Sequence, residues 1–283
     1  MKTPPEEPGS DQAQAWDKAA DGWYRNAALV NTWLQEVTPA MLDAAGIGPG
    51  ARVLDVAAGA GGQTLAIARR VGGSGYVLAT DVAPQVVALA RENVRASGLA
   101  HVEVEVADAQ ALGLAGAGFD AAVCRLGLMF CAEPQTALSE IASALKPGGR
   151  VAAVVFSEPQ ANPCVTILMS TARRHAGLPP GSPYAPGTLF SLGKPGVLAG
   201  MLEAAGFDEI KVRAIAAPLR LASSTAYMDF IRSSGSPIMA ILAPLSERQR
   251  AQAWDDMQEQ LDQFATDGGW CGPNELLLAS ARV

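Results

Sequence analysis

The sequence VLDVAAGAGG, residues 53–62, carries the clearest indication of the fold class. A short apolar run leads directly into a glycine-rich turn, and a helical pattern follows over residues 64–71. Glycines allow the backbone to approach a ligand closely, where a Cβ atom would clash. In an open parallel sheet such a turn lies at the carboxyl end of a strand, which is where these sheets bind their ligands. The stretch therefore predicts a ligand-binding strand–turn–helix unit.

Strand and helix patterns alternate along the chain around this turn. Short apolar runs separated by helices of about 10–15 residues are typical of βαβ units and a parallel sheet. The predicted strands cover residues 52–56, 75–80, 102–106, 119–125, 150–156, 209–215 and 275–283. The predicted helices between them cover residues 64–71, 84–97, 136–145 and 196–205. We therefore expect an α/β fold with a doubly wound, mostly parallel, seven-stranded, Rossmann-like sheet.

The segments outside this alternation complete the expected organisation, which is one domain over residues 11–283. Residues 1–10 are rich in Pro and Glu and are predicted to be a disordered tail. Residues 11–45 follow a helical pattern and predict an N-terminal helical lid, and the ligand-binding half then covers residues 46–158. Two segments, 159–195 and 223–270, interrupt the alternation and are predicted to be cap insertions that hold the substrate.

Charge and hydropathy exclude several classes of partner. The formal net charge is -7, and no run of Lys and Arg exceeds two residues, so nucleic acid is a poor candidate. The N-terminus lacks the apolar stretch of a signal peptide, and no run has the roughly 18 apolar residues of a membrane span. The four cysteines contain no C-x-x-C pair and are expected to be reduced thiols. We therefore expect a cytoplasmic protein that acts on a small molecule.

Two acidic residues distinguish this turn from a dinucleotide site. Asp81 follows the second predicted strand, where it is placed to accept hydrogen bonds from ribose hydroxyls, as in nicotinamide-binding proteins. However, Thr64 replaces the third glycine of G-x-G-x-x-G, and Asp55 precedes the turn. A buried carboxylate at this position disfavours a pyrophosphate and favours a cationic ligand such as S-adenosylmethionine. A nicotinamide cofactor is the weaker alternative.

Several further motifs occur in order along the chain. They are the glycine turn ending at Thr64, Ala79–Asp81, Ala107–Leu112, Phe119–Asp120, Leu145–Arg150 and Phe156–Pro159. With these motifs the chain resembles the class I S-adenosylmethionine-dependent methyltransferases, in particular the ubiquinone/menaquinone biosynthesis C-methyltransferase (type 11) family. The resemblance covers residues 45–156 and continues more loosely to residue 212. It implies a transferase with S-adenosylmethionine as its cofactor.

The resemblance also implies a set of cofactor-binding residues. Those around the methionine part are Asp55, Ala57, Gly59, Gly61 and Thr64. Asp81 is implied to hold the ribose, with Val82 against the adenine ring, while Asp108 and the backbone of Ala109 bind the adenine amino group and Arg125 also contacts the cofactor. Asp108 is equally typical of a turn or a helix cap. We interpret Asp120 and residues 146–149 as turn chemistry without a catalytic role.

The residues after the fourth strand point to an apolar acceptor. The family has a stretch resembling Gly-Leu-Arg-Asn here, whereas this chain has Gly127-Leu128-Met129-Phe130. Met129 and Phe130 are therefore candidates for an adaptable apolar wall around the acceptor, and the alternative is that both pack under the cap. Tyr24 is a further candidate for acceptor contact. Together with Trp16, Trp23 and Trp33, Tyr24 belongs either to an aromatic lid over the sulfonium or to an amphipathic helix on the core.

The sequence offers few residues for acid–base catalysis. His175 is a candidate general base, but Arg173-Arg174-His175 also has the pattern of a solvated helix C-terminus. In-line methyl transfer mainly requires alignment of donor and acceptor and exclusion of water, so a dedicated base is optional. We therefore predict methyl transfer to a small, largely apolar phenol, quinol, thiol or similar nucleophile, with no metal ion.

Three other functions are alternatives to this prediction. A nucleic-acid methyltransferase usually has an Asn-Pro-Pro-Tyr-like run after the fourth strand, which Cys124-Arg125-Leu126-Gly127 does not resemble. An arsenite methyltransferase needs converging thiolates, for which Cys131, Cys164 and Cys271 are the candidates, although buried free cysteines are commoner. A protein that binds the cofactor without transferring its methyl group would retain the same cofactor motifs.

Overall fold

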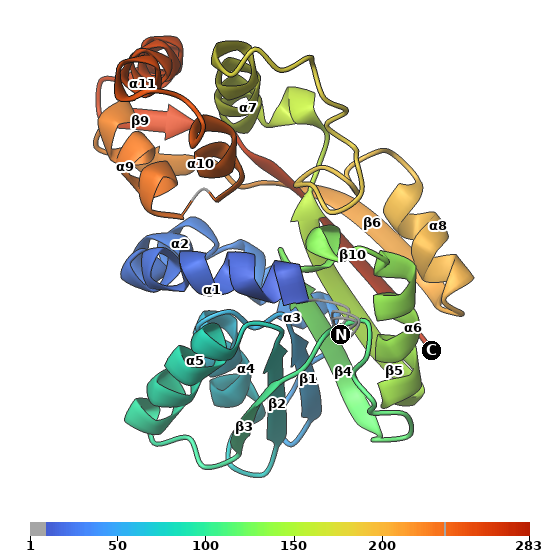
Figure 1. Ribbon diagram of the computed structural model, residues 1–283. Coiled ribbons are helices and arrows are strands. Elements are labelled where there is room, and N and C mark those ends of the chain that lie inside the picture. Colours follow the sequence, from blue (N-terminus) through green and yellow to red (C-terminus); the bar gives the residue numbers. More distant parts are fainter. Residues whose placement is uncertain (1–9, 235) are drawn as a thin grey trace, which may run out of the picture.

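The computed structural model describes residues 10–234 and 236–283, and its centre is a seven-stranded sheet with the order β3-β2-β1-β4-β5-β10-β6 (Figure 1). The strands are β1 Arg52–Val56, β2 Tyr76–Asp81, β3 Val102–Val106, β4 Phe119–Arg125, β5 Leu145–Phe156, β6 Asp208–Ala216 and β10 Glu275–Arg282. Strand β10 pairs antiparallel with both β5 and β6, while β1 to β5 pair in parallel. The predicted mostly parallel, Rossmann-like sheet is confirmed.

The central strands are buried on both faces because helices cover the sheet. Residues 53–56 of β1 and 121–124 of β4 are all buried, as expected for a sheet enclosed between helices. One set of helices consists of α3 Val37–Ala44, α4 Gly62–Val71 and α5 Pro84–Ser97, and the other of α6 Pro134–Ala144 and α8 Val197–Ala204. Helices α3, α4 and α5 contact one another in series, and α6 contacts α8.

The cap is built from two parts of the chain that are distant in sequence. It contains α7 Pro163–His175, α9 Ser224–Ser234, α10 Ser236–Leu242 and α11 Glu247–Leu261, with short 3-10 turns at 159–161 and 262–264. A second sheet has the order β7-β9-β8, with β7 Leu219–Leu221, β8 Ala265–Thr266 and β9 Gly269–Gly272. The sequence pattern predicted neither α7 nor this small sheet. Pro and Gly residues flank α7, and Pro163 occupies the first helical turn, where a missing N–H costs nothing.

The N-terminal helices connect the sheet to the cap. Helix α1 Ser10–Arg25 is followed by α2 Ala27–Trp33, and α1 contacts α5 as well as α9 and α10 of the cap. Figure 1 shows α1 between the carboxyl ends of the central strands and the cap helices. Gly22 lies so close to α9 that an added Cβ atom would be 1.7 Å from the Ser233 carbonyl oxygen. The predicted disordered tail, apart from Ser10, lies outside the described residues.

None of the described helices is both long and apolar enough to cross a membrane, in agreement with the prediction that the chain has no spanning helix.

Candidate functional site

The turn after β1 adopts the conformation that its glycines predict. Gly59 and Gly61 have φ of 59° and 87°, and Ala57, which is not a glycine, has φ of 55°. A Cβ atom added to Gly59 would meet nothing within 4 Å, whereas one added to Gly61 would lie 3.5 Å from the Ala90 side chain. The open space at Gly59 fits a ligand that approaches the backbone. At Gly61 the contact with Ala90 would be an ordinary one, and glycine is favoured there by the left-handed φ.

Asp55 lies behind this turn with its carboxylate fully buried. Gln63 Nε2 donates to Oδ1 over 2.7 Å and Thr64 Oγ1 donates to Oδ2 over 2.6 Å. Burial raises the pKa of Asp55 to about 6, although both hydrogen bonds and the charge of Arg125 act in the opposite direction. Asp55 and Thr64 are thus predicted site residues that shape the turn from within the core. Gln63 was missed, because its neighbours in the sequence give no signal for this bond.

Asp81 joins the end of β2 to the glycine turn. Its Oδ2 accepts from Gly59 N over 2.9 Å, and its Oδ1 accepts from Ala83 N over 3.1 Å. Its carbonyl accepts from Ala107 N over 3.0 Å, which connects it to the loop after β3. Burial raises the pKa of Asp81, and these backbone donors lower it. The side chain remains partly exposed at the carboxyl edge of the sheet, where the sequence placed it.

The predicted adenine-binding residues lie along the same edge. Val82, Asp108 and Ala109 are all half-buried, and Val106, two residues before Asp108, pairs in register with Asp81. Oδ1 of Asp108 accepts from the backbone N of Gln110 over 2.9 Å, which is the turn geometry considered as an alternative. Gln110 Nε2 also donates to Oδ1 and Oδ2 of Asp108, over 3.1 and 3.3 Å. The two carboxylate oxygens still offer further acceptor positions.

The turn after β4 packs against the turn after β1. A Cβ atom added to Gly127 would lie 2.3 Å from that of Ala57, and the preceding Leu126 has φ of 62°. Arg125 donates from Nη1 to Thr38 Oγ1 of α3 over 2.6 Å. Burial lowers the pKa of Arg125 to about 10, and the charge of Asp55 opposes that shift. Thr38 was missed, because it lies 87 residues from Arg125 in the chain.

The acceptor candidates occupy different environments. Met129 is only 1% exposed and belongs to the main core, as the packing alternative predicted. Phe130 is half-buried, and its ring meets that of Trp16 edge-on with centroids 5.1 Å apart. Tyr24 is 42% exposed on α1. Phe130 is thus the acceptor candidate that lies against the N-terminal helix.

The aromatic residues of the N-terminal helices separate into two groups. Trp16 and Trp23 are neighbours on α1 with centroids 6.3 Å apart, and Trp23 also meets Phe230 of α9 at 5.9 Å. Trp33 instead packs against Phe156 of β5, and its Nε1 donates to the carbonyl of Ala217 over 2.7 Å. Trp33 therefore packs against the main core, whereas Trp16 and Trp23 lie between the sheet edge and the cap.

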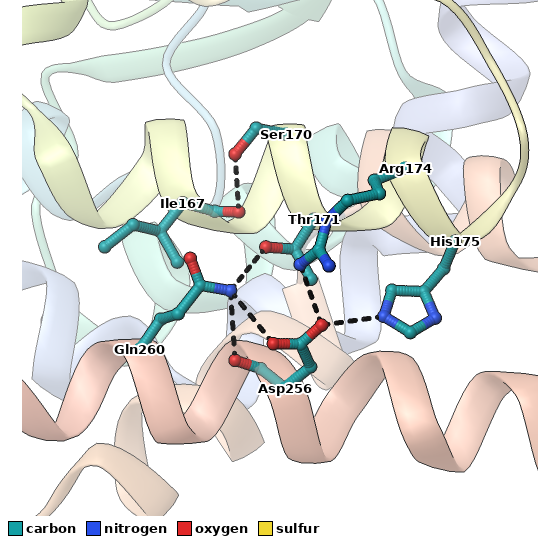
Figure 2. A network of polar contacts seen from close by, with 7 residues as sticks. All are labelled: Ile167, Ser170, Thr171, Arg174, His175, Asp256 and Gln260. Atoms are coloured by element: carbon teal, nitrogen blue, oxygen red, sulfur yellow. Dashed lines mark hydrogen bonds and ion pairs between the residues drawn. The ribbon is translucent and has the colours of Figure 1, made fainter.

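His175 is the last residue of α7 and forms part of a contact between two cap helices (Figure 2). Its Nε2 lies 2.8 Å from Asp256 Oδ2 of α11, and Arg174 Nη2 donates to the same oxygen over 2.7 Å. Gln260 Nε2 donates to Thr171 Oγ1 over 2.9 Å, which adds a second link between the helices. The His175 hydrogen bond and Arg174 hold the pKa of Asp256 below its usual value. This arrangement accounts for His175 as a residue that fastens α7 to α11.

The cysteines do not assemble a metal-binding group. Within residues 10–234 and 236–283, no cluster of three or more His, Cys, Asp or Glu side chains is placed to hold a metal ion. Burial raises the pKa of the Cys131 and Cys164 thiols to about 12, so both are neutral near pH 7. The arrangement therefore gives no support to an arsenite-type site.

Comparisons with known proteins find similarity to methyltransferases. Residues 53–149 match the family model described as a methyltransferase domain. An uncharacterized protein of Mycobacterium tuberculosis is 28% identical over 257 residues, which are 86% of this chain and 85% of that protein. The ubiquinone/menaquinone biosynthesis C-methyltransferase UbiE of Erwinia tasmaniensis is 36% identical over 123 residues, 43% of this chain and 49% of that enzyme. This match thus spans about half of UbiE.

The solved structure of a phosphoethanolamine N-methyltransferase 2 of Haemonchus contortus, in complex with phosphomonomethylethanolamine and S-adenosylhomocysteine, has the same fold. It superimposes with a TM-score of 0.58 at 18% identity, covering 96% of this chain and 58% of that one.

Proposed function

We propose that this chain, an S-adenosylmethionine-dependent methyltransferase of the class I fold, methylates a small, largely apolar acceptor. Methyl transfer and the cofactor follow from the methyltransferase domain at residues 53–149 together with the Rossmann-like sheet. The acceptor class is our inference. We propose a phenol, quinol, thiol or similar nucleophile.

One observation carries the inference about the acceptor. The carboxyl edge of the sheet, where Asp81 and the turn after β4 lie, is covered by aromatic side chains of α1 and of the segment after β4. Trp16 and Phe130 meet across this edge with their centroids 5.1 Å apart. Such rings gain free energy when they bury apolar surface, and they offer little to a strongly hydrated, charged acceptor.

The residues of the edge fit the cofactor that the fold implies. When bound, S-adenosylmethionine supplies a methyl group activated by its sulfonium. We assign the space beside Gly59 to the cofactor and the partly exposed carboxylate of Asp81 to its ribose, with Ala57, Gly61, Val82, Asp108 and Ala109 around them. Asp55 is ionised at neutral pH, since its pKa is about 6. Its buried negative charge behind the turn favours a cationic ligand, and Arg125 partly offsets this charge.

Asp55, Thr64 and Arg125 have positioning roles in this proposal. Thr64 and Gln63 hold the Asp55 carboxylate, and Arg125 joins the turn after β4 to α3. The described side chains near the edge do the work of alignment and exclusion of water, which can supply much of the rate for a reaction with an activated donor. We assign His175 to cap stability, because its ring already binds Asp256.

The proposal is tested with matched acceptors of increasing polarity. Purified protein is incubated with S-adenosylmethionine carrying a labelled methyl group and with pairs of phenols and thiols that differ only in an added carboxylate or ammonium. We expect labelled product from the uncharged member of a pair, with kcat/KM at least about tenfold above that of the charged member. Equal or better turnover of charged acceptors would contradict the apolar class.

The same assay separates methyl transfer from cofactor binding alone. A protein that only binds the cofactor would release no label to any acceptor, although calorimetry would still detect S-adenosylhomocysteine. An arsenite acceptor is included as a further arm, and turnover of arsenite that is abolished by Cys131→Ser would favour the thiolate mechanism instead.

A further inference from the structure

The indole N–H of Trp23 is a buried hydrogen-bond donor without a partner. In the part of the chain that the structure describes, Trp23 Nε1 is the one buried side-chain nitrogen or oxygen atom that lacks a hydrogen bond. A buried donor left unpaired costs free energy, and native proteins tolerate few of them. Such an atom on an element that covers a binding edge therefore indicates a partner other than the protein itself.

Other tryptophans of this chain show what a structural indole does with its N–H. Trp33 Nε1 donates to the Ala217 carbonyl over 2.7 Å, and Trp270 Nε1 donates to the Leu261 carbonyl over 2.8 Å. Both rings are wedged between elements and both donors are satisfied by backbone. Trp23 is packed by neighbouring rings in a similar way but is not satisfied, which separates it from these two structural residues.

Trp23 is connected through neighbouring rings to the carboxyl edge of the sheet, where we place the cofactor. Four rings form a continuous series from the cap to the sheet, in the order Phe230, Trp23, Trp16 and Phe130. Trp16 packs on the apolar cluster of Ala20, Ala83 and Val86, and Ala83 is the residue whose N–H binds Asp81. At the other end, Phe130 lies three residues after Gly127, which touches the turn after β1. The series therefore runs across the edge that we assign to the cofactor.

We propose that Trp23 Nε1 donates a hydrogen bond to an oxygen atom of the methyl acceptor, whose flat apolar body lies against the rings of Trp16 and Phe130. This inference rests on the proposed function and narrows its acceptor class to uncharged aromatic or conjugated molecules that carry a hydroxyl or carbonyl oxygen. Trp23 is then a specificity-determining residue: the hydrogen bond selects an oxygen-bearing acceptor over a hydrocarbon or thiol of the same shape.

The test pairs a change in the protein with a change in the ligand. The probes are 2-naphthol and 2-methylnaphthalene, which have similar shapes and differ in the oxygen. They are titrated into the full chain saturated with S-adenosylhomocysteine. In the wild-type protein we expect 2-naphthol to bind about five- to tenfold more tightly, and in Trp23→Phe we expect the ratio of the two dissociation constants to fall to near one. Trp33→Phe is the matched control: it removes an indole whose N–H is already bonded, so the ratio stays at its wild-type value.

NMR of the indole N–H groups gives a readout that does not depend on activity. The chain has five tryptophans, and the Trp23 signal is identified by its loss in Trp23→Phe. We expect 2-naphthol to move this signal in the direction of a stronger hydrogen bond, and 2-methylnaphthalene to leave it nearly in place. If Trp23→Phe does not fold, replacement of the Trp23 ring by benzothiophene, with sulfur in place of N–H, keeps the shape and removes only the donor.

Several results would overturn the inference. They are an unchanged dissociation-constant ratio in the donor-free variant, a loss of S-adenosylhomocysteine affinity with the ratio intact, and failure of 2-naphthol to bind up to its solubility limit. The inference can fail while the proposed function stands, if apolar acceptors are methylated without regard to their oxygen. If the ratio collapses as expected but no acceptor is methylated, the proposed function fails and the Trp23 site stands.

Discussion

Replacing Asp81 with Ala removes the group that joins the second strand, the glycine turn and the proposed ribose site. Its two carboxylate oxygens accept from Gly59 N and Ala83 N over 2.9 and 3.1 Å. In the complex with cofactor, Asp81→Ala leaves ribose hydroxyls without their acceptor in a closed site. An unpaired polar group of this kind costs about 1–3 kcal/mol, or roughly ten- to a hundredfold in affinity. Calorimetry with S-adenosylhomocysteine measures this loss. NAD, the alternative cofactor considered from the sequence, should bind neither the wild-type protein nor Asp81→Ala.

Asp120→Ala is the matched control for this experiment. Asp120 is also a carboxylate at the end of a strand that accepts from a backbone N–H, that of Arg52 over 2.7 Å, and it pairs with Lys146. It lies at the amino end of β4, on the opposite edge of the sheet from Asp81. The variant should lose some stability and keep its affinity for S-adenosylhomocysteine. Wild-type affinity in Asp81→Ala, or an equal loss in both variants, would refute the placement of the cofactor beside Asp81.

Four further substitutions test other parts of the site. The folded-state pKa of Asp55, about 6, lies above its ordinary value of 3.8, so the folded protein holds this proton more tightly. The contribution of Asp55 to the unfolding free energy should therefore fall by about 2 kcal/mol as pH rises from 4 to 6, and Asp55→Asn should flatten that part of a pH series of denaturation curves. Phe130→Ala should raise the acceptor KM about tenfold or more at constant cofactor affinity, because burial against a Phe ring contributes about 1.5–3 kcal/mol. Met129→Ala, in the core, should instead lower the unfolding free energy by about 2–5 kcal/mol. If Phe130→Ala lost stability and Met129→Ala raised the acceptor KM, then Met129 would be the acceptor contact and Phe130 the core residue. His175→Gln should lower thermal stability and leave kcat and its pH profile unchanged; a large fall in kcat would restore His175 as a candidate base and would contradict its assignment to the contact with Asp256.

Features set by local sequence could be predicted. The run from Val53 to Gly62 contains its own strand, turn and helix start, and the structure places all three there. Asp81 could be placed beside the turn because the carboxyl ends of paired parallel strands meet at one edge. This rule for parallel sheets allowed the turn after β1 and the residue at the end of β2 to be placed together, although they are separate in the sequence.

Features that depend on distant contacts could not be predicted. The bond from Arg125 to Thr38 joins residues that are 87 positions apart, and Asn162 bonds the backbone of Glu275 across 113 positions. Helix α7 was obscured by the Pro and Gly residues around it, although its last residues, Arg173 to His175, carry the charge pattern of a helix C-terminus. No sequence pattern distinguishes the unpaired N–H of Trp23 from that of a bonded indole.

Methyl transfer is tested by quantifying both of its products in one reaction. Purified protein is given S-adenosylmethionine and the most active uncharged phenol or thiol of the acceptor panel, and S-adenosylhomocysteine and methylated acceptor are quantified together. We predict that the two products form in equal amounts over many turnovers, and that Asp81→Ala slows both to the same extent at limiting cofactor. Cofactor binding with no acceptor-dependent formation of S-adenosylhomocysteine across the whole panel would show that the protein does not methylate these acceptors.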